Sequence, residues 1–73
     1  MSDSKLVYMA NQIAKNLKSL SEKEALASTE EHIRLYWTPA MLREIFGLMD
    51  AGGEGLEPLA RQALESLRAR KAA

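Results

Sequence analysis

Two adjacent amides, Asn11 and Gln12, are the residues of this chain best suited to specific chemistry, and they lie in the middle of a predicted helix. Asn is a mediocre helix former because its side-chain amide competes for backbone hydrogen bonds, so local propensity does not explain its presence. The chemistry open to such amides is hydrogen bonding. They could cap a neighbouring helix end or bridge two helices, or they could contact a partner protein, and the sequence leaves both interpretations open.

The apolar residues of the same helix predict which way the amides point. At about 100° per residue they share one stripe, the pattern of a helix that packs on one side. The stripe consists of Leu6, Met9, Ala10, Ile13, Leu17 and Leu20. Asn11 is expected roughly opposite this stripe, close to Lys15 and Lys18, and Gln12 nearer its edge beside Tyr8. Tyr8, Asn11, Gln12 and Lys15 are therefore candidates for binding a partner.

A second set of candidate residues lies in the next predicted helix. His32 is interpreted as a structural or surface histidine, because a lone histidine makes a poor metal site. Tyr36 and Trp37 are of the types that anchor protein interfaces, although Trp37 is expected mainly in the core, with its N–H bonded locally. Leu35 points away from the apolar stripe of its helix and, with Tyr8, suggests a second interface. Leu35 and Trp37 complete the partner-binding candidates.

The glycine-rich stretch from Gly52 to Gly55 superficially resembles a phosphate-binding loop, but no predicted strand precedes it and no Lys-Ser/Thr pair follows. It is interpreted as a helix stop and turn, in which glycine supplies a left-handed conformation. The sequence also shows no nucleophile–base pair, and it has no cysteine to hold an iron–sulfur cluster. We therefore expect no catalytic residue, cofactor or metal in this chain.

Composition favours a small soluble domain spanning residues 1–73, whose single core supplies only about 3–5 kcal/mol. Ten basic residues balance ten acidic ones, which argues against binding of nucleic acid. No apolar run is long enough to span a membrane, and the N-terminus lacks the features of a secretory signal. A cytoplasmic protein is expected, stabilised by tight helix packing or by association with another protein. Self-association of the isolated chain is left open.

Four helices are predicted, over residues 4–20, 22–37, 39–51 and 58–70. The first helix has Asp3 or Ser4 as its expected N-cap. For the second helix, Ser21 and Glu24 have the spacing of a capping box, in which each residue satisfies a free N–H group of the first turn. These start signals predict where the first two helices begin.

Thr38-Pro39 predicts the start of the third helix, with a Thr cap and a Pro at the first helical position. Because Pro39 disfavours helical geometry at the preceding residue, helices two and three should meet at a sharp corner. The third helix is the most apolar and is expected to be central, and the fourth is expected to fray after Leu67. The corner excludes a simple up-and-down bundle, so the fold class predicted is all-α, a compact orthogonal bundle of about four short helices.

Three segments of the chain also carry motifs in a fixed order and spacing. They are Lys5 to Ala14, which contains Met-Ala-Asn-Gln-Ile-Ala; His32 to Met41, which contains Trp-x-Pro-x-Met; and Asp50 to Leu59, which contains Ala-Gly-Gly-x-Gly-Leu. Together they resemble the delta subunit of soluble NAD-dependent formate dehydrogenases, over roughly residues 5 to 67. Thr38 and Glu57 stand where that family often has Asp, and Glu is a poorer cap because its longer side chain must fold back.

The resemblance implies a small accessory subunit without cofactor, which binds the molybdopterin catalytic subunit and supports its assembly, stability or activity. Enzymes of this family oxidise formate at a molybdenum or tungsten bis-pterin centre and pass electrons through iron–sulfur clusters and flavin to NAD. One alternative is a transient chaperone for insertion of the molybdenum cofactor, and a remote one is a small helical regulator. The choice between a permanent and a transient partner, and between molybdenum and tungsten, is left open.

Overall fold

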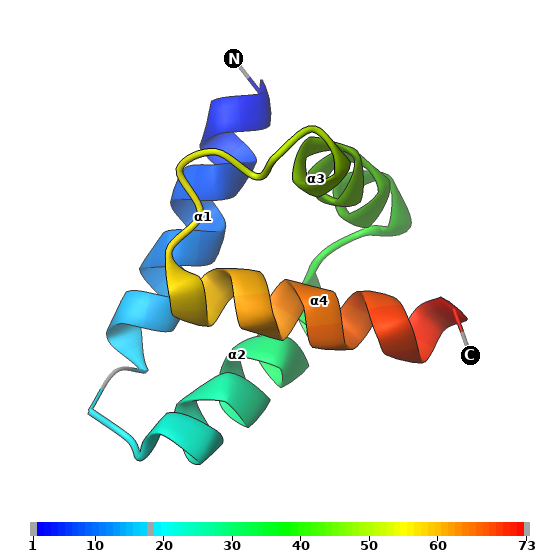
Figure 1. Ribbon diagram of the computed structural model, residues 1–73. Coiled ribbons are helices and arrows are strands. Elements are labelled where there is room, and N and C mark those ends of the chain that lie inside the picture. The colour runs from blue at the N-terminus through cyan, green and yellow to red at the C-terminus, as the bar shows by residue number, and fades with distance from the viewer. Residues whose placement is uncertain (1, 18, 73) are drawn as a thin grey trace.

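The computed structural model describes residues 2–17 and 19–72, and these residues form four helices and no strand (Figure 1). The helices are α1 (Ser2–Asn16), α2 (Glu22–Tyr36), α3 (Pro39–Asp50) and α4 (Pro58–Ala72). In Figure 1 α4 runs across α1, and α3 is seen nearly end-on beside them. The predicted all-α class, with helices crossing one another at steep angles, is confirmed.

The first helix is displaced toward the N-terminus relative to its predicted range. It begins at Ser2, so both expected caps, Asp3 and Ser4, lie inside the helix. It ends at Asn16, after which Leu17 donates its N–H to the Ala14 carbonyl at 3.2 Å in a tight final turn. The chain must leave the helix there to reach the cap of α2, and Leu20 consequently lies in the connection and is 40% exposed. Lys18 lies outside the described residues.

The starts of α2 and α3 are capped by the predicted side chains. Ser21 accepts a hydrogen bond from the Glu24 N–H at 3.2 Å, and Thr38 accepts one from the Met41 N–H, also at 3.2 Å. Trp37 and Thr38 both have extended backbone angles, with ψ of 138° and 160°. These two extended residues make the corner between α2 and α3 that the Thr-Pro pair predicts.

Glycines end α3 as predicted and form the turn that leads to α4. The Gly52 N–H binds the Met49 carbonyl at 3.0 Å and the Gly53 N–H binds the Leu48 carbonyl at 2.8 Å, which is the Schellman pattern. Both glycines have positive φ, +120° and +62°, so the helix-stop interpretation is confirmed. Beyond the turn, α4 continues to Ala72 and does not fray after Leu67.

The core is formed by the packing of α1 against α2, α3 and α4 and by the packing of α2 against α4. The expectation that α3 would be the central helix is wrong. α1 contacts each of the other three helices, α2 and α4 share the most extensive contact, and α3 packs mainly on α1. Small side chains on α4, Ala60 and Ala63, are fully buried and allow this close approach. The buried core consists of Leu6, Ala10, Ala14, Ile33, Trp37, Leu42, Ile45, Met49, Leu56, Ala60, Leu64 and Leu67.

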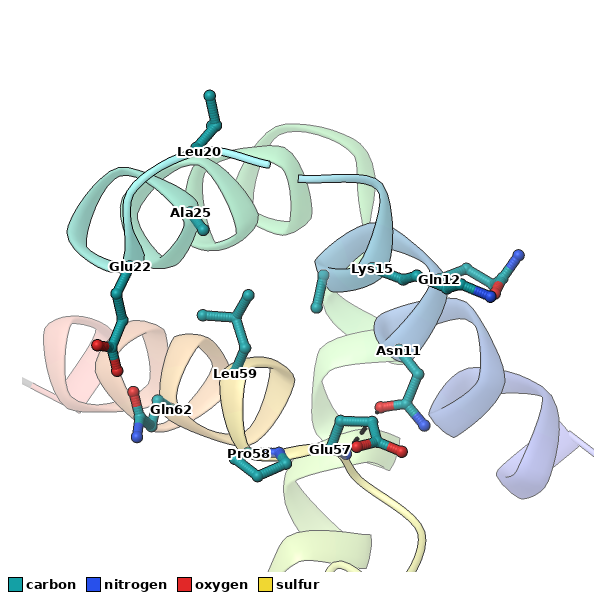
Figure 2. A pocket seen from close by; sticks show the side chains of 11 residues that line it. Asn11, Gln12, Lys15, Leu20, Glu22, Ala25, Glu57, Pro58, Leu59 and Gln62 are labelled. Atoms are coloured by element: carbon teal, nitrogen blue, oxygen red, sulfur yellow. Dashed lines mark hydrogen bonds between the residues drawn. The ribbon is translucent and has the colours of Figure 1, made fainter. Parts of the chain in front are cut away.

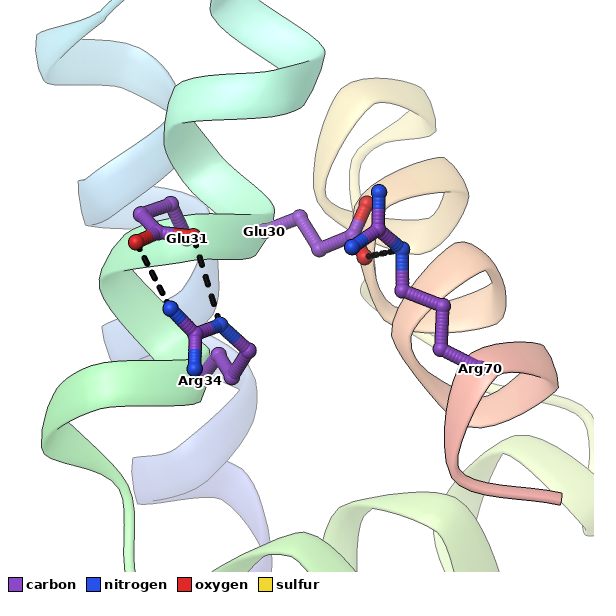
Figure 3. Close-up of polar contacts among 4 residues, drawn as sticks. All are labelled: Glu30, Glu31, Arg34 and Arg70. Atoms are coloured by element: carbon purple, nitrogen blue, oxygen red, sulfur yellow. Dashed lines mark hydrogen bonds and ion pairs between the residues drawn. The ribbon is translucent and has the colours of Figure 1, made fainter. Parts of the chain in front are cut away.

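Two polar residues are buried where α2 and α4 meet. The Glu30 side chain is only 8% exposed, and its Oε2 lies 2.8 Å from the Nε of Arg70, which is itself 70% exposed (Figure 3). On the outer side of α2, Arg34 donates to Glu31 at 2.7 and 3.3 Å, and this hydrogen bond lowers the pKa of the Glu31 carboxyl below its ordinary value. The Glu30–Arg70 pair joins the two helices, whereas the Glu31–Arg34 pair stays within α2.

The second buried polar residue, Thr29, gives a stability prediction. Its Oγ1 is buried and has no hydrogen-bond partner among the described residues. Since an unpaired buried hydroxyl is unfavourable, Thr29→Val should stabilise the protein by about 1 kcal/mol. The measurement is the midpoint of urea unfolding, which should rise at an unchanged m-value.

The matched control is Thr38→Val, which makes the same chemical change at a hydroxyl that caps α3. Loss of that cap should destabilise the protein by about 1 kcal/mol. A Thr29→Val variant that unfolds at lower urea than the parent would show that the buried hydroxyl is satisfied after all.

Candidate functional site

Asn11 joins α1 to the segment that opens α4. Its Nδ2 donates a hydrogen bond to the Gly55 carbonyl at 2.8 Å. Its Oδ1 accepts one from the Glu57 N–H at 2.9 Å, and this second bond is drawn in Figure 2. Both ends of the amide are therefore used within the chain. Of the two interpretations open from the sequence, the intramolecular one, an amide that caps a neighbouring helix end, is confirmed for Asn11.

The start of α4 explains why an external amide is needed. The first intrahelical bond of α4 runs from the Arg61 N–H to the Glu57 carbonyl at 2.9 Å, so Glu57 occupies the cap position. In a capping box the N–H of the cap residue is bound by a side chain from the first turn of its own helix. Here Asn11 of α1 binds it instead. The sequence predicts Asn11 opposite the apolar stripe of α1, and on that side the chain between α3 and α4 contacts α1 through these two hydrogen bonds.

Asn11→Ala should destabilise the protein by about 1–3 kcal/mol, because it leaves the Gly55 carbonyl and the Glu57 N–H without their partner. Thermal or urea unfolding followed by circular dichroism measures the effect. Gln12→Ala is the matched control, since Gln12 is the adjacent amide and is exposed; it should change stability by less than about 0.5 kcal/mol. Equal losses in the two variants would contradict the assignment of Asn11 as the helix cap.

Gln12 and Lys15 line a groove with Asn11, so the structure brings three of the six sequence candidates together. The groove has a volume of about 880 Å³ and lies between the end of α1, the start of α2 and the start of α4 (Figure 2). It is lined by Asn11, Gln12, Ala14, Lys15, Leu20, Glu22, Ala25, Glu57, Pro58, Leu59 and Gln62. We call this surface the α1–α2–α4 groove.

The groove has an apolar middle and a polar edge. Leu59 lies between Ala25 and the α1 wall in Figure 2, while Glu22 and Gln62 stand together on one side and Lys15 lies on the opposite side. This distribution is that of a protein interface, with an apolar centre that can exclude water and a polar rim that sets orientation. An apolar side chain is the kind of group that the middle of such a groove can accommodate.

A second surface lies on the outer face of α2. A shallow hollow of about 500 Å³ is lined there by Ala27, Ser28, Glu31, His32, Leu35 and Tyr36. Leu35 is 57% and Tyr36 71% exposed, and the rings of His32 and Tyr36 lie 4.8 Å apart. Leu35 points outward as predicted. Tyr36 is exposed at the last residue of α2, where the chain turns away from the helix.

The remaining two candidates lie apart from both surfaces. Trp37 is buried in the core, which confirms its interpretation as a core residue and leaves little of its ring to contact a partner. Tyr8 is 64% exposed and lines neither the groove nor the hollow on α2. His32 is an exposed surface residue, as the structural or surface interpretation predicts.

Within residues 2–17 and 19–72, no group of three or more His, Cys, Asp or Glu side chains is placed to hold a metal ion. None of the helices in these residues has the length and apolar character needed to cross a membrane.

Residues 2–17 and 19–72 define a small all-α domain of four helices with two hollowed surfaces, the α1–α2–α4 groove and the hollow on α2. Residues 5–64 match the family model described as NADH-dependant formate dehydrogenase delta subunit FdsD, and the chain belongs to this family. The match confirms the family predicted from the three sequence segments. Comparison with curated proteins and with solved structures gave no match.

Proposed function

We propose that the chain is a non-catalytic accessory subunit of a cytoplasmic NAD-dependent formate dehydrogenase and binds the molybdopterin catalytic subunit of that enzyme. The observation that carries the proposal is membership of the delta-subunit family over residues 5–64. The groove supports it, because an open surface with an apolar centre and a polar rim is what a binding domain needs. The redox centres would reside in the other subunits, and this chain would hold no cofactor.

The mechanism that follows from such binding is thermodynamic linkage. A partner that binds only the folded domain, present at 100 times its dissociation constant, stabilises that domain by about 2.7 kcal/mol. By the same linkage, the domain favours whichever conformation of the catalytic subunit binds it better. An assembled or cofactor-loaded conformation of that subunit would thereby become more populated without any chemical step in this chain.

The test is co-expression of the chain with the other subunits, followed by purification through a tag on the catalytic subunit. The proposal predicts that the chain co-elutes in a fixed ratio through size-exclusion chromatography and that its omission lowers yield, thermal stability or molybdenum content of the enzyme. A transient chaperone would instead restore molybdenum content without being retained in a fixed ratio. A chain that neither co-elutes nor alters the enzyme would overturn both possibilities.

A further inference from the structure

We propose that the α1–α2–α4 groove is the docking site for a cationic amphipathic segment of the partner subunit. An apolar side chain of that segment would enter the groove beside Leu59, and a flanking Lys or Arg would pair with the carboxylates at its rim. The inference rests on the proposed function, and it adds which surface docks and what chemistry the partner presents there.

The apolar middle of the groove argues for an apolar anchor on the partner. Ala14 and Ala25 are buried small residues on facing helices, and they leave room between α1 and α2 at the level of Leu59. Leu20 reaches the groove from the connection between α1 and α2 and keeps 40% of its surface exposed. An apolar side chain that fills this space would bury the free surface of both leucines, which is the main source of affinity at an interface centre.

The charges at the rim argue for a cationic partner. Glu22 and Glu57 place two carboxylates at the groove and Lys15 one ammonium group. None of the three is in an ion pair with another described residue, whereas the acidic residues Glu30, Glu31 and Asp50 elsewhere in the described chain are paired with arginines. Among the described residues that line the groove, the carboxylates outnumber the ammonium group by two to one, and a segment with Lys or Arg beside its apolar anchor complements this excess.

The outer face of α2 also exposes apolar side chains, but the carboxylate of Glu31 beside them is already paired. Its charged residues Glu31 and Arg34 already form a hydrogen-bonded pair with each other. The two surfaces thus differ in whether their carboxylates are already paired, so an experiment can tell which of them binds the partner. Each also presents an exposed leucine, Leu20 in the groove and Leu35 on α2, so the same substitution can be made in both.

The decisive experiment compares Leu20→Asp with Leu35→Asp in the full complex. Both side chains are exposed, so neither variant should unfold the chain, and circular dichroism of each isolated variant verifies this. The affinity for the tagged catalytic subunit should fall at least about tenfold in Leu20→Asp, because the variant puts a carboxylate among the apolar side chains that line the groove and that binding would bury. Leu35→Asp should bind within about twofold of the parent chain. The reverse order, or no loss in either variant, overturns the groove assignment.

A second pair of variants tests the sign of the partner's charge. Glu22→Gln combined with Glu57→Gln should weaken binding and flatten its dependence on ionic strength, because the attraction to a cationic segment is lost. Lys15→Gln should leave binding unchanged or make it tighter. Weaker binding in Lys15→Gln alone would show that the occupant is anionic and would overturn the chemistry proposed here.

Failure of the proposed function is distinguishable from failure of this inference. If the parent chain does not bind the catalytic subunit, the proposed function falls and the inference falls with it. If the parent chain binds and Leu20→Asp binds equally well, only the groove assignment is overturned. A groove that serves a small molecule instead would give this second result.

Discussion

Leu64→Ala is expected to leave the isolated protein largely unfolded. Leu64 is among the largest side chains that are fully buried, and it lies on α4, which shares its most extensive contact with α2. Truncation of a buried leucine to alanine costs about 2–5 kcal/mol, and a domain of this size has only about 3–5 kcal/mol in total. Loss of the helical circular dichroism signal, or a melting transition shifted far below that of the parent, measures the result.

The control for this prediction is Leu35→Ala, the same truncation at a leucine that is 57% exposed on the outer face of α2. It should change the free energy of unfolding by less than about 0.5 kcal/mol. Addition of the catalytic subunit should partly restore the fold of Leu64→Ala if binding is linked to folding. A Leu64→Ala protein as stable as Leu35→Ala would show that α4 contributes little to the core, against its observed burial.

Gly53→Ala is expected to destabilise the protein by about 2–3 kcal/mol for two separate reasons. Gly53 has a φ of +62°, a conformation that costs a residue with a Cβ about 1–2 kcal/mol. A Cβ at this position would also lie 2.7 and 2.8 Å from the two terminal guanidinium nitrogens of Arg61. That guanidinium donates to the Gly52 and Gly53 carbonyls at 3.2 and 2.8 Å, and it would have to move away from them.

Gly47→Ala is the matched control, because Gly47 lies inside α3 and a Cβ there would meet nothing within 4 Å. It should stabilise the protein by about 0.5–1 kcal/mol, the difference in helix propensity between Gly and Ala. Urea unfolding of both variants measures the free energy of unfolding, which should fall in Gly53→Ala and rise in Gly47→Ala. If Gly53→Ala were as stable as the parent protein, the requirement for glycine at position 53 would be contradicted.

The double variant Gly53→Ala with Arg61→Ala separates the two causes. If the contact with the guanidinium matters, removing Arg61 should recover part of the loss, so the effects of the two single changes will not add. If only the backbone conformation matters, the two effects should add.

The helix starts and stops could be predicted from the sequence because each depends on neighbouring residues. Ser21 and Thr38 cap the helices that they precede, and Gly52 and Gly53 end α3 through bonds within a single turn. The end of α1 was less predictable. Its apolar pattern continues through Leu20, but the chain leaves the helix after Asn16 to reach α2.

The contacts of Asn11 could not be predicted from the sequence. A helical projection compares residues of one helix, and by that measure Asn11 faces outward from the apolar stripe. The structure places the segment from Gly55 to Glu57 on that side, and this placement depends on residues more than forty positions away. The groove was not predictable for the same reason, because its walls come from three helices. The sequence did identify Asn11, Gln12 and Lys15 as neighbours, since Asn11 and Gln12 are consecutive and Lys15 follows about one helical turn later on α1.

The link between Asn11 and the start of α4 also has a consequence for synthesis on the ribosome. The bonds of Asn11 span 44 and 46 residues, so they cannot form until translation has passed Glu57. Contacts at such separation must first overcome the entropy of closing a long loop. One wall of the groove belongs to α4, the last helix to emerge. A nascent chain that stops short of this helix lacks both the hydrogen bonds of Asn11 and the complete groove, so recognition through that surface must follow the synthesis of α4.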